Sequence, residues 1–185
     1  MRLSYTTHSP SHVDAEGAII IEAIRSRRYP RGLTPLDLAL LHAPHIAGGW
    51  NAFLGAVRNH SSLPDDLREI AICRVAAVNR AWYEWMHHAP LAVGRGGMSE
   101  DSVTFLLEPA ELQTVETPSD YTERQWVVAV VADEMTRHIG VPDDIFASLK
   151  RLFSESEIVE IISTIACYNC VSRFLVALDG LETFP

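Results

Sequence analysis

Apolar residues recur at intervals of three and four positions along most of this chain, and that spacing predicts helices. No stretch of any length alternates apolar and polar residues in the way that a half-buried strand does. The fold class that we expect is therefore all-α, with about eight helices. The predicted helices lie within residues 14–28, 34–41, 44–59, 67–79, 82–94, 99–107, 122–138, 142–153 and 154–180.

Capping residues and glycines refine these predicted helices. Asp14, Thr34 and Thr122 each precede an apolar-periodic stretch, and their side-chain oxygens can accept from free backbone N–H groups at a helix start. Gly48 and Gly49 are unusual inside a helix, because two adjacent glycines lower its stability. We expect them to permit close packing or a bend.

The stretch over residues 67–98 combines apolar helix faces with ionisable side chains, and it reads as two helices joined by a short turn. Positions three and four residues apart are neighbours on a helix, so Glu84 can lie beside both His87 and His88. The first of the two helices carries Glu69 close to its apolar face. Burial would raise the pKa of such a carboxyl group into a range useful for proton transfer. We therefore expect the chemistry in this stretch.

The composition is that of an ordinary globular domain, with 48% apolar and 21% charged residues in a chain of 185. The balance of 15 basic and 24 acidic residues gives a net charge of −9, which argues against nucleic-acid binding. No apolar stretch approaches the roughly 18–20 residues of a membrane span, and the N-terminus lacks a signal-peptide core. Three cysteines fit a reducing compartment. We expect a cytoplasmic protein without membrane partners.

A known motif runs through the central stretch. Eleven residues separate Glu69 from Ala81, and Glu84 and His88 follow at intervals of three and four. This order resembles the motif of the AhpD alkylhydroperoxidases, which reads Glu, eleven residues, Cys-x-x-Cys, three residues and His. Both cysteine positions hold other residues here.

Further segments extend this resemblance to the carboxymuconolactone decarboxylase-like family, whose all-helical fold is shared with AhpD. The Tyr-Glu-Trp at residues 83–85 resembles cysteine-lacking members of that family, and residues 63–69 and 168–174 match it as well. The resemblance covers most of the chain from about Leu33 onward. It implies a carboxymuconolactone decarboxylase-like domain over residues 31–185, preceded by an N-terminal arm and helix over residues 1–30.

The resemblance also implies an activity. We expect a cofactor-free acid–base enzyme acting on a small lactone or keto acid, first a carboxymuconolactone decarboxylase-type carboxy-lyase and otherwise an isomerase. Loss of CO2 from such a substrate leaves a carbanion that a conjugated carbonyl delocalises, so neither metal nor prosthetic group is required. We expect His88 to donate the proton, with Glu69 and Glu84 as its orienting and relaying partners.

Several other side chains are candidates for substrate binding. Arg74 and Arg173 are basic residues inside otherwise apolar helices, where a charge needs a partner. Either can clamp a substrate carboxylate with its bidentate geometry, whereas the alternative for Arg74 is a buried ion pair with Glu69. The remaining candidates are the aromatic residues Trp50 and Tyr83, which are otherwise core residues, and His87, which is the reserve for His88.

Two alternatives belong to other classes of function. An AhpD-like peroxidase would need thiols, but Glu84 cannot be oxidised and resolved as a thiolate can. Cys167 and Cys170 form a Cys-x-x-Cys in the middle of an apolar helix, where we expect core residues and not a redox pair. The other alternative is a helical oligomer that binds a small acid without turnover.

The sequence also bears on metal ligands and on binding partners. Glu84 and His87 supply one Glu-x-x-His half of a di-iron motif, but the nearest second half, Glu134-x-x-x-His138, has the wrong spacing. We therefore expect no metal and no cofactor. The expected partners are a small carboxylate or lactone and further copies of this chain, as a dimer, trimer or hexamer. A mean hydropathy of +0.06 agrees with apolar surface hidden in such an interface.

Overall fold

The structure, a computed structural model of the chain, describes residues 2–6 and 13–178. Over these residues it contains nine α-helices, one 3₁₀ turn and no strand, which confirms the all-α prediction. The elements are α1 (Ala15–Arg28), α2 (Pro35–Leu40), α3 (Pro44–Asn59), α4 (Asp65–Asn79), α5 (Trp82–Gly94), α6 (Glu100–Phe105), η1 (Leu112–Thr114), α7 (Glu123–His138), α8 (Asp143–Leu152) and α9 (Glu155–Ala177).

The predicted caps lie at the observed helix starts. Oδ1 of Asp14 accepts a hydrogen bond from the backbone N–H of Gly17 at 2.7 Å. Thr34 and Thr122 each form a capping box with the residue three positions later, so two free N–H groups are satisfied at each helix start. Local sequence therefore determines where these helices begin.

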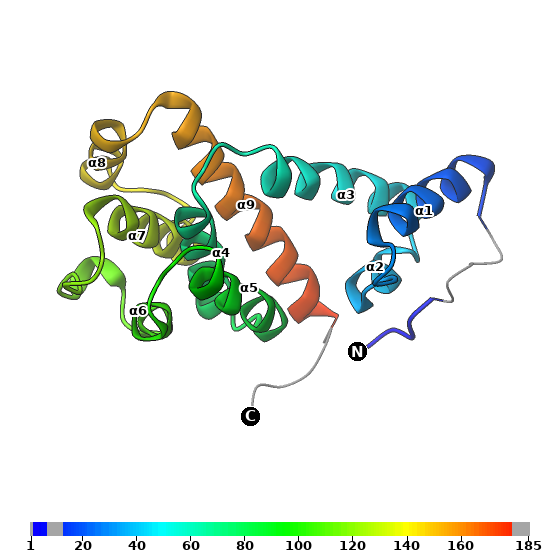
Figure 1. Cartoon of the computed structure of the whole chain (residues 1–185), viewed down its shortest axis with the longest axis horizontal. Coiled ribbons are helices and arrows are strands. Elements are labelled where there is room, and N and C mark those ends of the chain that lie inside the picture. The colour runs from blue at the N-terminus through cyan, green and yellow to red at the C-terminus, as the bar shows by residue number, and fades with distance from the viewer. Residues whose placement is uncertain (1, 7–12, 179–185) are drawn as a thin grey trace.

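Helix α4 is the centre of the larger half of the molecule. It packs against α5, α7 and α9, and every residue from Leu67 to Ala76 is buried. Figure 1 shows α4 enclosed by these helices, with α6 and α8 at the periphery. A helix buried on all sides must satisfy each polar side chain that it carries, and α4 carries Glu69 and Arg74.

Helices α1, α2 and α3 form the smaller half, on the other side of α9 in Figure 1. Helix α3 runs without interruption through Gly48 and packs against both α1 and α9. A Cβ atom at Gly48 would lie 3.2 Å from Cδ1 of Ile20, so this glycine allows α1 to approach α3 closely. Close packing is therefore the outcome at Gly48, whereas a Cβ atom at Gly49 would meet no atom of another helix within 4 Å.

Three segments differ from the prediction or lie beyond it. Residues 109–119, which lie outside every predicted helix, contain the turn η1. Most of the predicted N-terminal arm, residues 7–12, lies outside the described residues, as do the last two residues of the helix predicted to end at Gly180.

Helix α9 corrects one prediction about apolar segments. With 23 residues and a mean hydropathy of 1.4 in its best window, it is the one described helix long and apolar enough to cross a membrane. It nevertheless packs against α3, α4, α7 and α8, and ten of its residues are buried. Its apolar character is that of a core helix.

Candidate active site

The centre of the candidate site is a hydrogen bond between adjacent helices. Arg80 adopts a left-handed conformation, with φ 54°, and ends α4 so that α5 folds back along it. This reversal brings Nδ1 of His88 to 2.6 Å from Oε2 of Glu69. Both side chains are buried, with 6% of His88 and 4% of Glu69 exposed. The structure thus joins two of the three predicted catalytic residues.

A third helix extends this contact into a chain of hydrogen bonds. Nε2 of His88 lies 3.2 Å from the hydroxyl of Tyr168 on α9, and that oxygen accepts a hydrogen bond from Nε of Arg58 at 2.6 Å. Arginine only donates, so the Tyr168 proton is free to point at His88. The consistent arrangement has His88 Nδ1–H donating to Glu69 and His88 Nε2 accepting from Tyr168.

Burial and neighbouring charges set the ionisation of this chain. Burial lowers the pKa of His88, and the opposing attraction of Glu69 does not reverse the direction. The imidazole is therefore neutral at pH 7. Burial also disfavours the charge of Arg58, but Tyr168, Cys167 and Glu69 outweigh it and raise the pKa of the guanidinium. Arg58 remains the fixed positive charge of the group.

Glu84, the third predicted catalytic residue, is buried one turn from His88 but is not bonded to it. Neither carboxyl oxygen has a hydrogen-bond partner among the described residues. Burial raises the pKa of Glu84 to about 8, against the opposing influence of Ser172 and Arg58. The Ser172 hydroxyl donates instead to the Tyr168 carbonyl. Glu84 is therefore a neutral carboxylic acid at pH 7, with a proton that it can donate.

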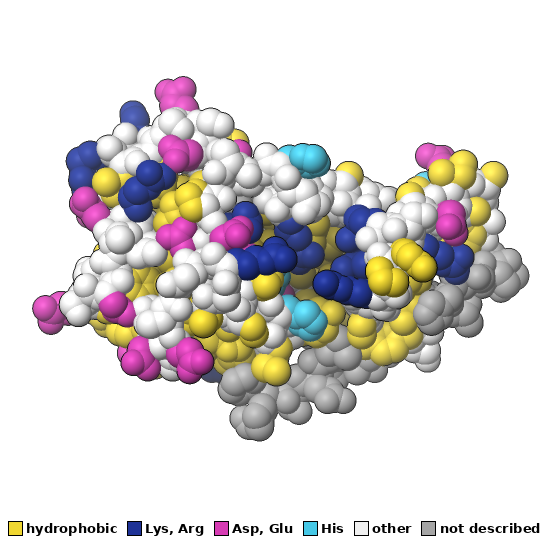
Figure 2. Space-filling model, viewed as in Figure 1, with side chains coloured by type: hydrophobic (Ala, Val, Ile, Leu, Met, Phe, Trp, Pro, Cys, Tyr) yellow, Lys and Arg dark blue, Asp and Glu magenta, His cyan; other side chains and the backbone are white. Residues whose placement is uncertain are grey.

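These side chains face a cleft of two adjoining cavities, of about 390 and 360 Å³, between the two halves of the molecule. Glu69, Glu84 and His88 line the larger cavity, and the two cavities share seven residues. Dark-blue basic side chains surround the hollow in Figure 2. Six of the fifteen basic residues of the chain line it, namely Arg27, Arg28, Arg31, Arg58, Arg68 and Arg95.

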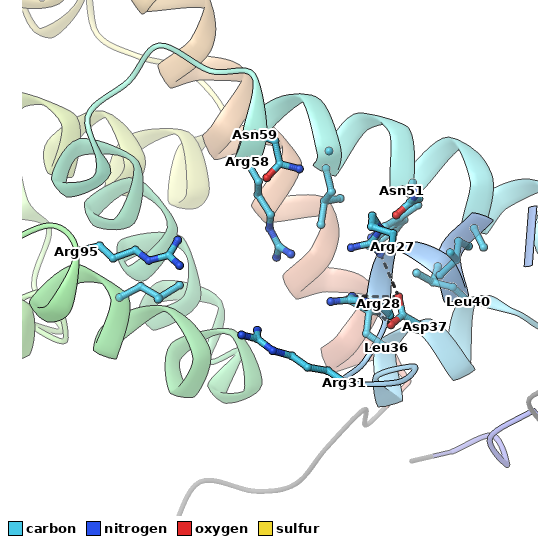
Figure 3. A pocket seen from close by; sticks show the side chains of 16 residues that line it. Arg27, Arg28, Arg31, Leu36, Asp37, Leu40, Asn51, Arg58, Asn59 and Arg95 are labelled. Carbon is cyan, nitrogen blue, oxygen red and sulfur yellow. Dashed lines mark hydrogen bonds and ion pairs between the residues drawn. The ribbon is translucent and has the colours of Figure 1, made fainter. Parts of the chain in front are cut away.

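The arginines of the cleft exceed the acids that neutralise them. Arg28 is paired with Asp37, with Nε and Oδ2 2.7 Å apart. Arg31 and Arg95 make no ion pair with any described residue, and both extend with Arg58 into the space between the two halves (Figure 3). Because Glu84 is neutral, this space is positively charged in a protein whose net charge is −9. Such a cleft attracts small anions.

The aromatic residues and the histidine that were predicted to bind substrate line different cavities of the cleft. Tyr83 and His87 line the larger cavity, and Nδ1 of His87 lies 2.7 Å from the carbonyl oxygen of Tyr83. Trp50 lines only the smaller one, where its ring packs on Phe174 with centroids 5.1 Å apart. His88 is the buried member of the histidine pair and His87 the exposed one, as the register had predicted.

The structure does not bring Arg74 and Arg173 to the cleft. The Arg74 guanidinium is buried against Asp133, with Nη2 and Oδ1 2.7 Å apart, and it also donates to three backbone carbonyl groups. The buried ion pair was the stated alternative for Arg74, but its partner is Asp133 and not Glu69. Arg173 is exposed and lines neither cavity.

The cysteines lack the arrangement of a dithiol site. Cys167 is buried, as predicted, and so is Cys73, but Cys170 is exposed, which corrects its assignment to the core. Burial raises the pKa of Cys167 to about 12 and also raises that of Cys73. Protonated thiols are poor nucleophiles.

Sequence reasoning missed the cations of the site. Arg58 and Tyr168 are 110 positions apart, and no local pattern connects them. A basic run that begins at the end of α1, with Arg27, Arg28 and Arg31, supplies three of these cations and was the available signal for a positively charged site. Arg95 lies just beyond the end of α5 and carried no signal of its own.

Comparisons with known proteins agree with this fold. Residues 44–113 match the model of the carboxymuconolactone decarboxylase family, a segment that includes Glu69, Glu84 and His88. No curated protein matches the chain by sequence.

Solved structures share the fold at low sequence identity. An alkylhydroperoxidase AhpD core protein from Ralstonia eutropha JMP134, described as peroxidase-related, is 14% identical with a TM-score of 0.73, over 98% of this chain and 92% of that one. A peroxidase-related protein from Silicibacter sp. TM1040 is 14% identical with a TM-score of 0.72, over 98% and 91%. The debrominase Bmp8, in complex with 2,3,4-tribromopyrrole, is 20% identical with a TM-score of 0.71, over 92% and 89%.

The family model and the neighbours confirm the resemblance that the motif predicted. The matched segment carries the central helix pair α4 and α5, and the neighbours extend the likeness to nearly the whole chain. Over residues 44–113 this chain matches the model of the carboxymuconolactone decarboxylase family, and its fold is the AhpD-like fold.

Proposed function

We propose that this protein is a cofactor-free acid–base enzyme that removes CO2 from a small carboxylated lactone or keto acid. The observation that carries the proposal is the state of Glu84. Its carboxyl group lines the cleft, is buried with a pKa of about 8, and has no hydrogen-bond partner among the described residues. A neutral acid held in a positively charged cleft is suited to protonate a carbanion.

The arginines support an anionic substrate. Arg31 and Arg95 have no ion-pair partner among the residues that the structure describes, and they face the cleft from opposite halves. A guanidinium binds a carboxylate through two parallel hydrogen bonds. In this proposal the two arginines hold the substrate carboxylate groups, and Tyr83 and Leu36 contact its apolar body.

The proposed reaction needs one bond cleavage and one proton transfer. The bond between the carboxylate carbon and the α-carbon breaks, and its electron pair moves onto the α-carbon and into the adjacent carbonyl group as an enolate. The carboxylate leaves as CO2. Glu84 then gives its proton to the α-carbon and regains one from solvent. Arg58, fixed by Tyr168, stabilises the negative charge of the enolate.

In this proposal His88 positions other groups and is not the proton donor that the sequence suggested. Its Nε2 atom accepts from Tyr168, and its Nδ1–H is committed to Glu69. No proton on His88 is therefore available to the substrate. The imidazole instead connects Glu69 to Tyr168 and through Tyr168 to Arg58, so it fixes the cation that faces the enolate.

The peroxidase alternative finds little support in the thiols. Cys167 is buried with a pKa of about 12, and Cys170, three residues later on α9, is exposed. Neither lines the cleft.

CO2 release and product mass, measured with a panel of carboxylated butenolides and β-keto acids, test the proposal. His88→Ala and the double variant Cys167→Ser/Cys170→Ser would be assayed beside the parent. We expect CO2 from the parent, a loss of about 10-fold to 100-fold in rate for His88→Ala, because Tyr168 and Arg58 lose their support, and no loss for the double variant. No CO2 from any compound with folded protein would contradict the lyase. Reduction of an alkyl hydroperoxide by the parent that is lost only in the double variant would favour a peroxidase.

A further inference from the structure

Three side chains with metal-ligand chemistry meet where α7 ends, away from the cleft. Glu134 and His138 lie one helical turn apart on α7, and Glu111 directly precedes η1. One ligand atom from each residue lies within 4.8 Å of the other two. None of the three lines the cleft.

Glu134 is buried in this cluster with an unsatisfied carboxylate. Its side chain is 2% exposed, and Oε1 has no hydrogen-bond partner among the described residues. A buried charged oxygen without a partner is costly, so such a group in a native protein needs an explanation. A bound cation would satisfy the oxygen.

The surrounding structure holds the cluster in place before any ligand arrives. The backbone N–H of Leu112, next to Glu111, donates to Oδ2 of Asp133 at 2.9 Å. Oδ1 of Asp133 accepts from Arg74 and Arg137, so its own charge is neutralised and the segment at η1 is tied to α7. Nε2 of His138 already lies 3.3 Å from Oε1 of Glu111. A site whose ligands are fixed in advance loses little entropy on binding.

We propose that Glu111, Glu134 and His138 bind one divalent transition-metal ion of the Zn²⁺ type. Two carboxylates and one imidazole form a donor set suited to such ions, whereas Mg²⁺ and Ca²⁺ prefer oxygen ligands alone. Glu111 and His138 are both about half exposed, so water completes the coordination. The ion connects the segment at η1 to the end of α7.

The geometry requires only a small closure. Ligand atoms that lie about 2.0–2.2 Å from one Zn²⁺ ion cannot be more than roughly 4.4 Å apart. The widest separation in the cluster is within 4.8 Å, and the exposed imidazole of His138 has room to move by this difference.

Calorimetric titration of the chelator-treated full chain with Zn²⁺ tests the proposal. We expect one ion per chain and a melting temperature that rises with Zn²⁺ concentration. Glu134→Gln and His138→Asn should each weaken binding at least tenfold. His138 lies on the surface, so its replacement leaves folding intact. His60→Asn is the matched control, because His60 is an exposed histidine at the end of a different helix, and it should bind as the parent does.

The alternative location for the ion is the histidine pair of the cleft. Binding that is retained in His138→Asn and lost in His88→Asn would place the ion there and overturn the proposal. No saturable binding up to millimolar Zn²⁺ would overturn it as well. Binding that is unchanged in His88→Asn and not displaced by millimolar Mg²⁺ would support it.

Discussion

Nδ1 of His88 lies 2.6 Å from Oε2 of Glu69, although the two residues are nineteen positions apart in the chain. The contact exists because the left-handed Arg80 reverses the backbone between α4 and α5. Glu69 is held within a helix whose inner residues are all buried, so the imidazole is its principal polar partner in the core. The position of His88, and through Tyr168 that of Arg58, depends on this pair.

Loss of the tyrosine hydroxyl tests the chain of hydrogen bonds beyond His88. In Tyr168→Phe, Nε2 of His88 and Nε of Arg58 both lose their partner. We expect kcat for CO2 release to fall about 10-fold to 100-fold, because a net hydrogen bond to a charged group contributes about 1.5–3 kcal/mol. Steady-state kinetics would separate this loss from any change in KM. An unchanged kcat would show that Tyr168 does not position Arg58 for the reaction.

The raised pKa of Glu84 predicts how stability depends on pH. The folded protein keeps the Glu84 proton up to pH about 8, whereas an unperturbed glutamate loses it near 4.5. Between these values the folded state binds more protons than the unfolded state, so the free energy of unfolding falls as pH rises. Each pKa unit corresponds to about 1.4 kcal/mol, so the total is a few kcal/mol.

Glu84→Gln isolates this effect, since glutamine does not ionise in this range. We expect the variant to gain stability relative to the parent as pH rises from 5 to 8, as measured by urea denaturation at each pH. Asp37→Asn is the matched comparison. Arg28 and Thr34 hold the pKa of Asp37 below its usual value of 3.8 despite burial, so Asp37→Asn should be less stable than the parent by an amount that stays constant from pH 5 to 8. If the free energy of unfolding changed with pH in the same way for the parent and for Glu84→Gln, the raised pKa of Glu84 would be contradicted.

The arginines of the cleft predict a separate kinetic effect. Replacing Arg31 or Arg95 by Gln removes a guanidinium that has no ion-pair partner among the described residues. We expect KM for a carboxylated substrate to rise about 10-fold to 100-fold, with a smaller change in kcat and little change in stability. The parent's kcat/KM should also fall as salt concentration rises. Arg173→Gln, on the exposed face of α9, should leave KM unchanged.

Replacement of Arg74 should lower the stability of the protein without affecting substrate binding. Its guanidinium and the Asp133 carboxylate are both about 1% exposed or less. Removing Arg74 leaves Asp133 with Arg137 as its one ion-pair partner and takes the donor from three backbone carbonyl groups, which destabilises by about 3–5 kcal/mol. Arg74→Met should therefore unfold at much lower urea concentration but retain the parent's KM in its folded fraction. If Arg74→Met instead raised KM and kept the parent's stability, Arg74 would bind the substrate carboxylate, as the sequence had suggested.

The fold was more predictable from sequence than the site. Helix starts depend on local chemistry, and the caps at Asp14, Thr34 and Thr122 are all present. Glu69 and His88 were found because the motif fixes their register. Arg58 and Tyr168 were not, because their contact depends on how α3 packs against α9 and not on sequence spacing.

For the buried ionisable residues too, the sequence predicted some features but not those that depend on how the helices pack. The sequence indicated that Arg74 needs a partner but not which one, since Asp133 lies 59 residues away on α7. It also indicated that Glu84 lies one turn from His88, and the expected hydrogen bond between them did not follow. Helical spacing brings two side chains near each other, but the surrounding helices decide where each one points.

The central claim is that Glu84 supplies the proton in a cofactor-free decarboxylation. The most direct test is the rate of CO2 release by the parent and by Glu84→Gln, side by side at pH 7, with substrate binding measured on both. The account predicts a loss of about 10²–10⁴ in kcat for Glu84→Gln with binding retained, and a parental rate that declines above pH 8. A variant that releases CO2 at the parent's rate would contradict it.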